Sequence, residues 1–168
     1  MRKTLKIEVF MSKPIKTNAM RMLESAGLSF RVVTYEVDEE DLSGVHAAHT
    51  CGLPVEQVFK TLVTKGDFEY LVACIPVEME LDLKKFAMVS GNKNVDMIAV
   101  KELLPLTGYI RGGCSPIGMK KPFATFFEES AILSDWIAVS AGMRGAQILI
   151  EPQSLIDFTG AGTGDIAR

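Results

Sequence analysis

The sequence predicts a single α/β domain of about six strands and five short helices. Three observations support this fold class. The chain has 168 residues, enough for one domain with a substantial core. Hydrophobic residues make up 48% of it and charged residues 23%, as in a folded globular protein. Short β-rich runs are interspersed with segments that have the capping residues, glycines and prolines typical of short helices.

The beginning of the chain predicts an extension, a helix and a strand. Met11-Ser12-Lys13-Pro14 resembles a second start, so we expect an N-terminal extension at 1–10 and the folded domain at 11–168. From Ile15 onward apolar residues recur at helical spacing until Gly27, which predicts a helix with one apolar stripe; its further members are Ala19, Met22, Leu23 and Ala26. The run from Phe30 to Tyr35 predicts a strand.

The next segments predict a short helix and a hairpin. Ser43 can cap a helix that runs through Cys51 and ends at Gly52, and Pro54 can open a further turn. The β-rich runs 58–65 and 68–75 are separated by Gly66-Asp67, a two-residue turn signal. We therefore expect two antiparallel strands joined by a tight turn.

Lys60 lies in the first strand of this predicted hairpin. Because side chains alternate along a strand, Lys60 shares a face with Val58 and Leu62. A two-residue turn sets Lys60 opposite Ala73, whose small side chain leaves space beside the ammonium group, so Lys60 can form the floor of a pocket. The alternative is that this face points to solvent and Lys60 is an ordinary exposed residue of an edge strand.

The second half of the chain predicts two short helices, three strands and a last helix. Asp82 can cap a helix that ends near Ser90-Gly91, and another helix is predicted at 100–104, before Pro105. Strands are predicted at 123–127, 136–140 and 146–150. Pro152 then begins a final helix, and the glycine-rich run 160–164 predicts a loose tail.

Residues 107–121 form a segment rich in glycine and proline between apolar parts of the chain. Gly108, Gly112, Gly113 and Gly118 lie close together with Pro116. Glycine accepts positive φ and allows close approach, while proline fixes φ, so the segment predicts a rigid loop of defined shape. Such a loop can hold a ligand, and it can equally be a connection that only reverses the chain.

Composition excludes several classes of protein. A net charge of −3 argues against nucleic-acid binding by bulk electrostatics, which needs many cationic phosphate contacts. No apolar run approaches the roughly 18 residues of a membrane helix, and the first residues lack the pattern of a secretory leader, so we expect a cytoplasmic protein without a membrane segment. The three cysteines, without C-x-x-C spacing, predict reduced thiols.

Few side chains in the sequence could carry out catalysis directly. His46 and His49 lie three residues apart with Cys51 nearby, but no further ligand completes a known zinc arrangement, so we expect no metal. These are the only histidines, so a cysteine nucleophile would depend on them as its base. What remains is Lys60 followed by Thr61, with backbone N–H groups at 112–115. Such donors can stabilise a developing oxyanion while water or the substrate supplies the nucleophile.

Three segments of the sequence resemble a known family. They are Phe59-Lys60-Thr61-Leu62; Thr107-Gly108-Tyr109 with Gly112-Gly113-Cys114-Ser115-Pro116-Ile117-Gly118; and Val139-Ser140-Ala141-Gly142-Met143-Arg144-Gly145 before a helix that begins at proline. Their order and spacing resemble the YbaK/EbsC family of free-standing trans-editing proteins, which is related to the editing domain of bacterial prolyl-tRNA synthetase. The likeness extends from about residue 12 to 160.

The resemblance implies an α/β fold with a central mixed, barrel-like sheet surrounded by short helices, and an aminoacyl-tRNA deacylase activity. The chain is most similar to the branch that removes cysteine from mischarged tRNA(Pro), in which Lys60 corresponds to the catalytic pocket lysine. The implied substrate-binding residues are Tyr35, Thr61, Gly112, Gly113, Ser115, Pro116, Ser140 and Gly142.

In that branch the thiol of the substrate attacks its own ester carbonyl and releases a cyclic thiolactone, and no metal or cofactor is implied. The implied partners are the acceptor end of tRNA(Pro) and prolyl-tRNA synthetase, and we expect a monomer. Some relatives carry an aromatic residue where this chain has Ser43, before Gly44. The cleaved amino acid is therefore open among cysteine, alanine, serine and threonine, and a non-catalytic protein that binds aminoacyl-tRNA or a synthetase is a further alternative.

Overall fold

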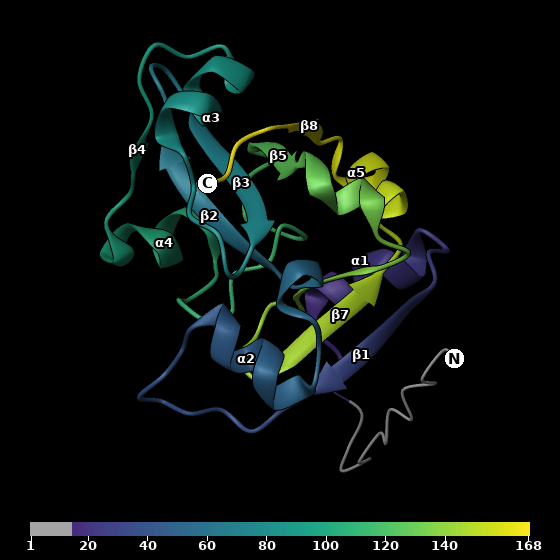
Figure 1. Cartoon of the computed structure of the whole chain (residues 1–168). Coiled ribbons are helices and arrows are strands. Elements are labelled where there is room, and N and C mark those ends of the chain that lie inside the picture. Colours follow the sequence, from purple (N-terminus) through teal and green to yellow (C-terminus); the bar gives the residue numbers. More distant parts are fainter. Residues whose placement is uncertain (1–14) are drawn as a thin grey trace.

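The computed structural model describes residues 15–168, which form two sheets surrounded by short helices (Figure 1). The predicted extension at 1–10 and the predicted start of the domain at residue 11 lie outside the described residues. The helices are α1 (Asn18–Ser25), α2 (Gly44–Cys51), α3 (Leu83–Ser90), α4 (Val100–Thr107) and α5 (Pro152–Thr159), with single 3-10 turns η1 (Val55–Gln57) and η2 (Glu129–Leu133). The strands are β1 (Phe30–Thr34), β2 (Phe59–Lys65), β3 (Tyr70–Pro76), β4 (Asp96–Met97), β5 (Ala124–Glu128), β6 (Ile137–Ser140), β7 (Ala146–Ile150) and β8 (Gly162–Gly164).

The larger sheet is mixed and the smaller one is antiparallel. Five strands follow the order β4-β2-β3-β5-β8, with β3, β5 and β8 parallel, and three strands follow the order β1-β7-β6. A single parallel bridge between Val58 and Ala138 links the two sheets. The sheets therefore form an open structure within residues 15–168, and the prediction of a barrel-like sheet is wrong on this point.

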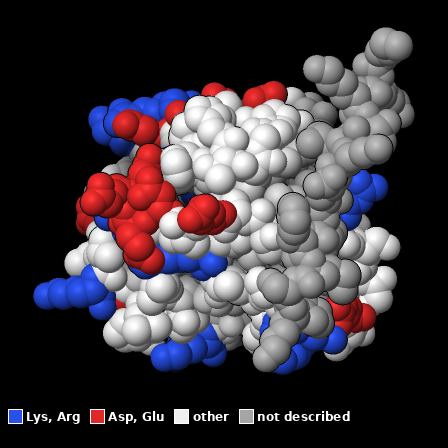
Figure 2. Space-filling model, turned by 90° about the horizontal axis from the view of Figure 1, so that it is seen from below, with Lys and Arg blue, Asp and Glu red and all other residues white. Residues whose placement is uncertain are grey.

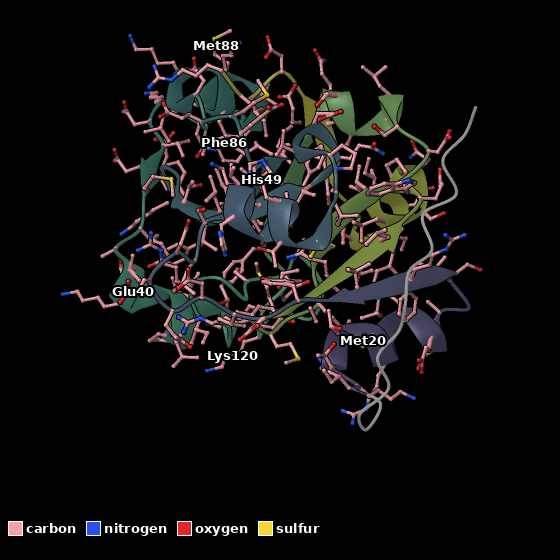
Figure 3. The ribbon with its side chains drawn as sticks, turned by 60° about the horizontal axis from the view of Figure 1, so that its bottom comes forward. Met20, Glu40, His49, Phe86, Met88 and Lys120 are labelled. Atoms are coloured by element: carbon pink, nitrogen blue, oxygen red, sulfur yellow. The ribbon has the colours of Figure 1, made fainter. Side chains whose placement is uncertain are left out.

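Both sheets contribute to one apolar core. Phe59 and Val72 of the larger sheet cluster there with Val139 and Ile148 of the smaller one, and with side chains of α1 and α5. The opposite face of β3 packs under α3, where Phe86 is fully buried. Figure 3 shows Phe86 and Met88 on this helix, and Met88 is mostly exposed. Both faces of β3 are thus buried, which explains its continuous apolar sequence.

The capped helices are confirmed with small changes. The side chains of Ser43 and Asp82 accept hydrogen bonds from the N–H groups of His46 and Lys85, as expected for N-caps. Helix α1 begins later than predicted, because the side chain of Thr17 caps it. Ile15 is consequently outside the helix, and the buried stripe includes Met20 instead of Met22 and Ala26.

Helix α4 continues through Pro105 to Thr107, three residues beyond the prediction. A proline in a helix removes one N–H donor. The last turn is held by other bonds, since the Thr107 hydroxyl donates to Leu103 O at 2.8 Å and the N–H of Gly108 donates to Leu104 O at 2.9 Å. The helix therefore ends at Gly108.

The β2–β3 hairpin is confirmed, but its predicted register is wrong. Lys65 pairs with Tyr70, so the turn contains residues 66–69, and Lys60 lies opposite Ile75 instead of Ala73. The Asp67 carboxylate accepts hydrogen bonds from the N–H groups of Lys93 and Asn94, at 2.6 and 3.1 Å, which holds the turn against the segment after α3. A shift of two residues preserves the face on which Lys60 lies.

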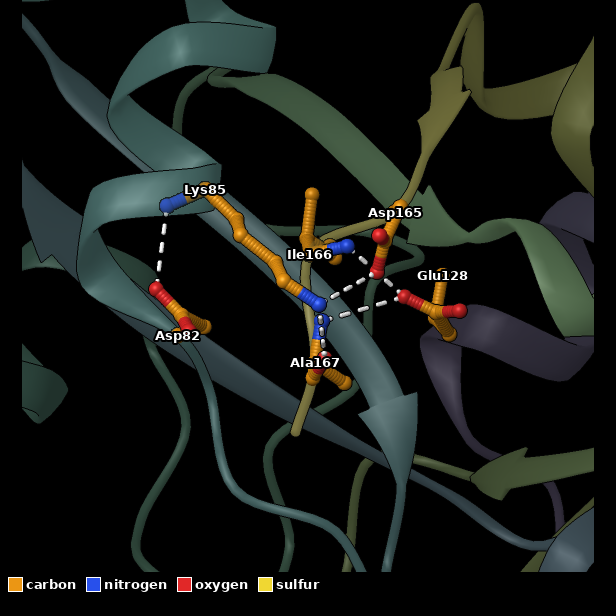
Figure 4. A network of polar contacts seen from close by, with 6 residues as sticks. All are labelled: Asp82, Lys85, Glu128, Asp165, Ile166 and Ala167. Carbon is orange, nitrogen blue, oxygen red and sulfur yellow. Dashed lines mark hydrogen bonds and ion pairs between the residues drawn. The ribbon is translucent and has the colours of Figure 1, made fainter.

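The predicted loose tail is instead an ordered part of the larger sheet. Strand β8 pairs in parallel with β5, and Ile166 and Ala167 are buried. The carboxylate of Glu128 accepts hydrogen bonds from the N–H groups of both residues, at 2.8 and 3.1 Å (Figure 4). Lys85 reaches the same segment and contacts Asp165 at 3.0 Å. Side chains distant in sequence therefore fix the C-terminal segment.

Candidate active site

A cavity of about 390 Å³ lies where the start of α2, strand β2, helix α4 and the ends of β6 and β7 meet. Five predicted site residues line it: Tyr35, Lys60, Thr61, Gly112 and Ser140. A larger groove of about 550 Å³ lies at the other end of α2, beside Cys51 and Trp136, and no predicted site residue lines it. The smaller cavity is therefore the candidate site.

Lys60 is half-buried in the wall of this cavity. Its Nζ donates to the carbonyl oxygen of Val77 at 3.4 Å. Burial lowers the pKa of Lys60, because it disfavours the charged ammonium, while the charge of Glu80 acts in the opposite direction. The lysine faces the cavity, and the alternative of a simple exposed edge residue does not hold.

The segment after β3 that contacts Lys60 is held at both ends. The N–H of Val77 donates to Val58 O at 2.8 Å, next to the start of β2. The main chain of Glu80 exchanges two hydrogen bonds with that of Arg168, at 2.9 and 3.0 Å. The ordered C-terminal segment therefore supports the loop that carries the carbonyl partner of Lys60.

The glycine loop and the turn at 141–145 pack directly on each other. A Cβ on Gly113 would lie only 3.0 Å from the backbone nitrogen of Arg144. Gly142 has a φ of +95°, and a Cβ there would lie 3.0 Å from the ring of Tyr109. The Arg144 side chain also donates to Arg111 O at 2.9 Å. The two glycines thus permit close contact between segments, and neither lines the cavity.

Four predicted site residues lie behind the cavity wall. Besides Gly113 and Gly142, these are Ser115 and Pro116, which are buried. The Ser115 hydroxyl accepts a hydrogen bond from the N–H of Ile117, and so shapes the loop. The N–H of Gly113 donates to Ile110 O at 3.0 Å, so this predicted oxyanion donor is already engaged.

The nucleophiles considered from sequence are poorly suited to that role. Burial raises the pKa of the Cys114 thiol, which lines the cavity, to about 12, and that of Cys51 to about 11. His46 lies outside the cavity beside Asp41, with Nδ1 at 3.6 Å from its carboxylate. Within residues 15–168, no group of three potential ligands could hold a metal ion. A nucleophile from the substrate or from water fits this site best.

The charges in and around the cavity are unevenly distributed. Lys60 and Arg111 line it, and its lining residues, all in the described part of the chain, include no carboxylate. Acidic residues instead lie in an adjoining recess, which Asp38 and Asp41 line together with Arg144. The side chain of Arg144 also pairs with Glu39 at 3.1 Å. Figure 2 shows acidic side chains gathered beside basic ones on one face. The interior of the cavity therefore favours negatively charged or carbonyl groups of a ligand.

Sequence reasoning missed several residues of the cavity. Arg111, Cys114 and Gln147 line it, as do the apolar residues Val100 and Leu103 of α4. Gln147 could have been found, because it is a polar residue within the apolar run 146–150. No local pattern distinguishes the α4 residues, whose apolar spacing also suits a helix packed on the core.

The sequence model of the aminoacyl-tRNA editing domain matches residues 40–158. The chain is 48% identical over 145 residues to EbsC of Enterococcus faecalis, a candidate Cys-tRNA(Pro)/Cys-tRNA(Cys) deacylase. This alignment covers 86% of this chain and 88% of EbsC. It is 28% identical over 74 residues to the proline–tRNA ligase of Thermosipho africanus, covering 44% of this chain and 13% of the ligase.

The fold is also found among solved structures. The crystal structure of a candidate trans-editing enzyme for prolyl-tRNA synthetase matches with a TM-score of 0.78 and 24% identity, over 92% of this chain and 99% of that one. This likeness confirms the predicted α/β fold. Across residues 15–168, no helix is both long enough and apolar enough to cross a membrane.

Proposed function

The chain belongs to the aminoacyl-tRNA editing domain family, and from this premise we propose that it is a trans-editing deacylase that clears Cys-tRNA(Pro). The observation that carries the proposal is the position of Lys60, which presents an ammonium group to a cavity whose lining residues include no carboxylate. Such a group can orient an ester carbonyl and stabilise the negative charge that develops on its oxygen.

The substrate supplies the nucleophile in this mechanism. The cysteine sulfur forms a bond to its own ester carbonyl carbon, and the bond from that carbon to the ribose oxygen breaks. The thiol loses its proton to solvent before it attacks, and the departing ribose oxygen gains a proton from solvent, so the products are a cyclic thiolactone and free tRNA. The raised pKa of Cys114 is consistent with this scheme, since the protein thiol in the cavity stays protonated.

The remaining predicted residues divide into two roles. Tyr35, Thr61, Gly112 and Ser140 line the cavity and would contact the aminoacyl ester and the terminal adenosine. Gly113 and Gly142 hold two wall segments together, while Ser115 and Pro116 fix the course of the loop. Substitutions in the first group should change substrate affinity or rate, and those in the second should first change stability.

The proposed partners follow from the substrate. The acceptor end of tRNA(Pro) carries the ester, and prolyl-tRNA synthetase would deliver this tRNA. The chain, which has a net charge of −3, would then not need to bind the whole tRNA strongly. The place of action would be the cytoplasm, where the charged tRNA is made, and we propose a monomer.

A panel of mischarged tRNAs tests the proposal. Cys-, Ala-, Ser- and Thr-tRNA(Pro) are incubated at equal concentration with the parent protein and with Lys60→Ala, and the remaining ester is counted. We expect the parent to clear Cys-tRNA(Pro) fastest. Faster clearance of another ester would reassign the amino acid, and binding without clearance of any ester would identify a non-catalytic protein.

A further inference from the structure

Arg111 is an exposed arginine that lines the candidate active site. Lys60 is half-buried in the cavity wall, so the exposed Arg111 lies nearer the opening. Among residues 15–168, the guanidinium group of Arg111 forms no hydrogen bond and no ion pair, whereas its neighbour Arg144 is paired with Glu39 at 3.1 Å. The N–H donors of Arg111 are therefore available to a ligand at the opening of the cavity.

The main chain holds Arg111 at the corner of a tight turn. The N–H of Gly113 donates to Ile110 O at 3.0 Å, and Gly112 has a φ of +85°, as in a type II turn. The carbonyl oxygen of Arg111 accepts a hydrogen bond from Arg144 Nε at 2.9 Å. These contacts involve only the main chain of Arg111, so the fold fixes where its side chain begins and leaves the guanidinium group free of them.

An acidic segment borders the same cavity. Residues 36–41 are all acidic apart from one valine, and their carboxylates belong to exposed residues. The segment is bounded by Tyr35 and Leu42, which both line the cavity. Because phosphates are repelled by carboxylates, a nucleic-acid strand that enters the cavity avoids this segment. Arg111 offers the strand a cation instead.

The substrate carries a phosphate close to its ester. In an aminoacyl-adenosine end the ester is on the 3′ oxygen of the ribose, and the phosphate that joins the preceding nucleotide is on the 5′ oxygen of the same ribose. One sugar separates the two groups, so one cavity must accommodate both. Lys60 suits the ester carbonyl in the interior. A guanidinium group matches the geometry of phosphate oxygens, so Arg111 suits the anion at the opening.

We propose that Arg111 is a substrate-binding residue whose guanidinium group pairs with the phosphate on the 5′ side of the terminal adenosine. This inference rests on the proposed function, because it takes the ligand to be the aminoacyl-adenosine end of a tRNA. In this arrangement the acidic segment 36–41 repels the strand while Arg111 receives it, which orients the acceptor end in the cavity. A contact with one phosphate is compatible with the net charge of −3.

Binding of two stable analogues tests the inference separately from catalysis. The first is 3′-deoxy-3′-(cysteinylamino)adenosine, and the second is its 5′-monophosphate. We expect the parent to bind the phosphorylated analogue about tenfold more tightly by calorimetry at low salt, and this preference should shrink as salt is added. Arg111→Gln should bind both alike. Arg31 provides the control, since it is an exposed arginine that lines the larger groove, and Arg31→Gln should keep the preference.

Thermal unfolding separates a ligand contact from a structural role. Because the side chain of Arg111 is exposed, Arg111→Gln should melt within about 2 °C of the parent. Loss of the preference for the phosphate in this folded variant supports the inference. Equal affinity of the parent for the two analogues, binding of neither included, overturns it, as does a variant that keeps the preference. A marked fall in melting temperature with equal loss of affinity for both analogues would give Arg111 a structural role and also overturn it.

Kinetics with the whole substrate give a second measurement. The phosphate does not change charge during deacylation, so its contact is equally strong in the ground state and the transition state. Arg111→Gln should therefore raise KM for Cys-tRNA(Pro) by about tenfold and leave kcat unchanged. A lower kcat at unchanged KM would contradict the proposed contact.

The proposed function can fail independently of this contact. A parent protein that shows the Arg111-dependent preference for the phosphorylated analogue and deacylates no tRNA of the panel would sustain the inference and refute the deacylase. A parent that deacylates Cys-tRNA(Pro) while both analogues bind alike would do the reverse.

Discussion

The Nζ of Lys60 lies 3.4 Å from the carbonyl oxygen of Val77, and this contact joins β2 to the segment that follows β3 across the cavity wall. An ammonium group has three donors, so one bond to Val77 leaves two for a ligand. The contact fixes the direction of the side chain before the substrate arrives, which is what electrostatic stabilisation of a transition state requires.

Replacement of Lys60 should abolish most of the deacylation. We expect Lys60→Ala to lower kcat/KM for Cys-tRNA(Pro) by about 10²–10³-fold, because the charge that stabilises the ester oxygen is lost. Lys65→Ala is the matched control, since Lys65 is an exposed lysine of the same strand. A folded Lys60→Ala protein with parental activity would show that the site is assigned wrongly.

The pH dependence of the deacylation rate should reflect the ionisation of Lys60. Its charged form is needed, and burial lowers its pKa, so activity should fall as the pH rises through a value below the ordinary lysine pKa of about 10.4. Ionisation of the substrate thiol should give the rising limb. In Lys60→Arg the guanidinium stays charged, so the falling limb should disappear from rates corrected for spontaneous hydrolysis. A falling limb that is the same in both proteins would assign it to another group.

The sulfur of the substrate should be essential. The 2-aminobutyryl ester of the same tRNA has a methyl group in place of the thiol and a similar size, so it should bind normally and react at least about 10²-fold more slowly. Single-turnover rates at saturating protein measure this difference without a contribution from affinity. Comparable rates for the two esters would indicate attack by water instead.

Local signals in the sequence were sufficient for most elements of the fold. Helix starts such as those at Ser43, Asp82 and Pro152 depend only on residues within one helical turn, so the local sequence predicts them. The predictions were wrong where contacts with residues distant in the sequence determine the local structure. The Asp67 carboxylate is held by the segment after α3, which widens the predicted turn, and the strand at 162–164 needs β5 as its partner.

The candidate site was predictable to the extent that its residues lie in glycine-rich or otherwise distinctive segments. Lys60 and Gly112 both line the cavity as expected. The same segments also supplied Gly113 and Gly142, which serve packing, because a glycine that permits close contact with a neighbouring segment has the same sequence signal as one that approaches a ligand. The register that brings Gln147 opposite Ser140 depends on sheet pairing, which no local pattern encodes.

Substitution of Gly142 should destabilise the cavity wall. Gly142→Ala combines a φ of +95° with a Cβ 3.0 Å from the ring of Tyr109, so we expect a loss of about 2–4 kcal/mol in the free energy of unfolding by denaturant titration. Gly160 is the control, because it has a φ of +65° and nothing within 4 Å of an added Cβ. Gly160→Ala should cost about 1–2 kcal/mol. Equal losses would mean that the Tyr109 contact contributes nothing.

The carboxylate of Glu128 should hold the C-terminal segment and, through it, the loop that contacts Lys60. Glu128→Ala leaves the buried N–H groups of Ile166 and Ala167 without an acceptor, which should cost about 2–4 kcal/mol in the free energy of unfolding. The exposed neighbour Glu129 gives the control, and Glu129→Ala should change stability by less than about 0.5 kcal/mol.

Hydrogen exchange distinguishes local loosening from a general loss of stability. If Glu128 acts on the segment, the amides of Ile166, Ala167 and Arg168 should lose protection first, since the Arg168 N–H donates to Glu80 O at 2.9 Å. The rate constant for deacylation should then fall while the fold remains intact, because the support of the Val77 carbonyl is weakened. If amide protection instead decreased equally throughout the sheet, the C-terminal segment would not be what positions Lys60.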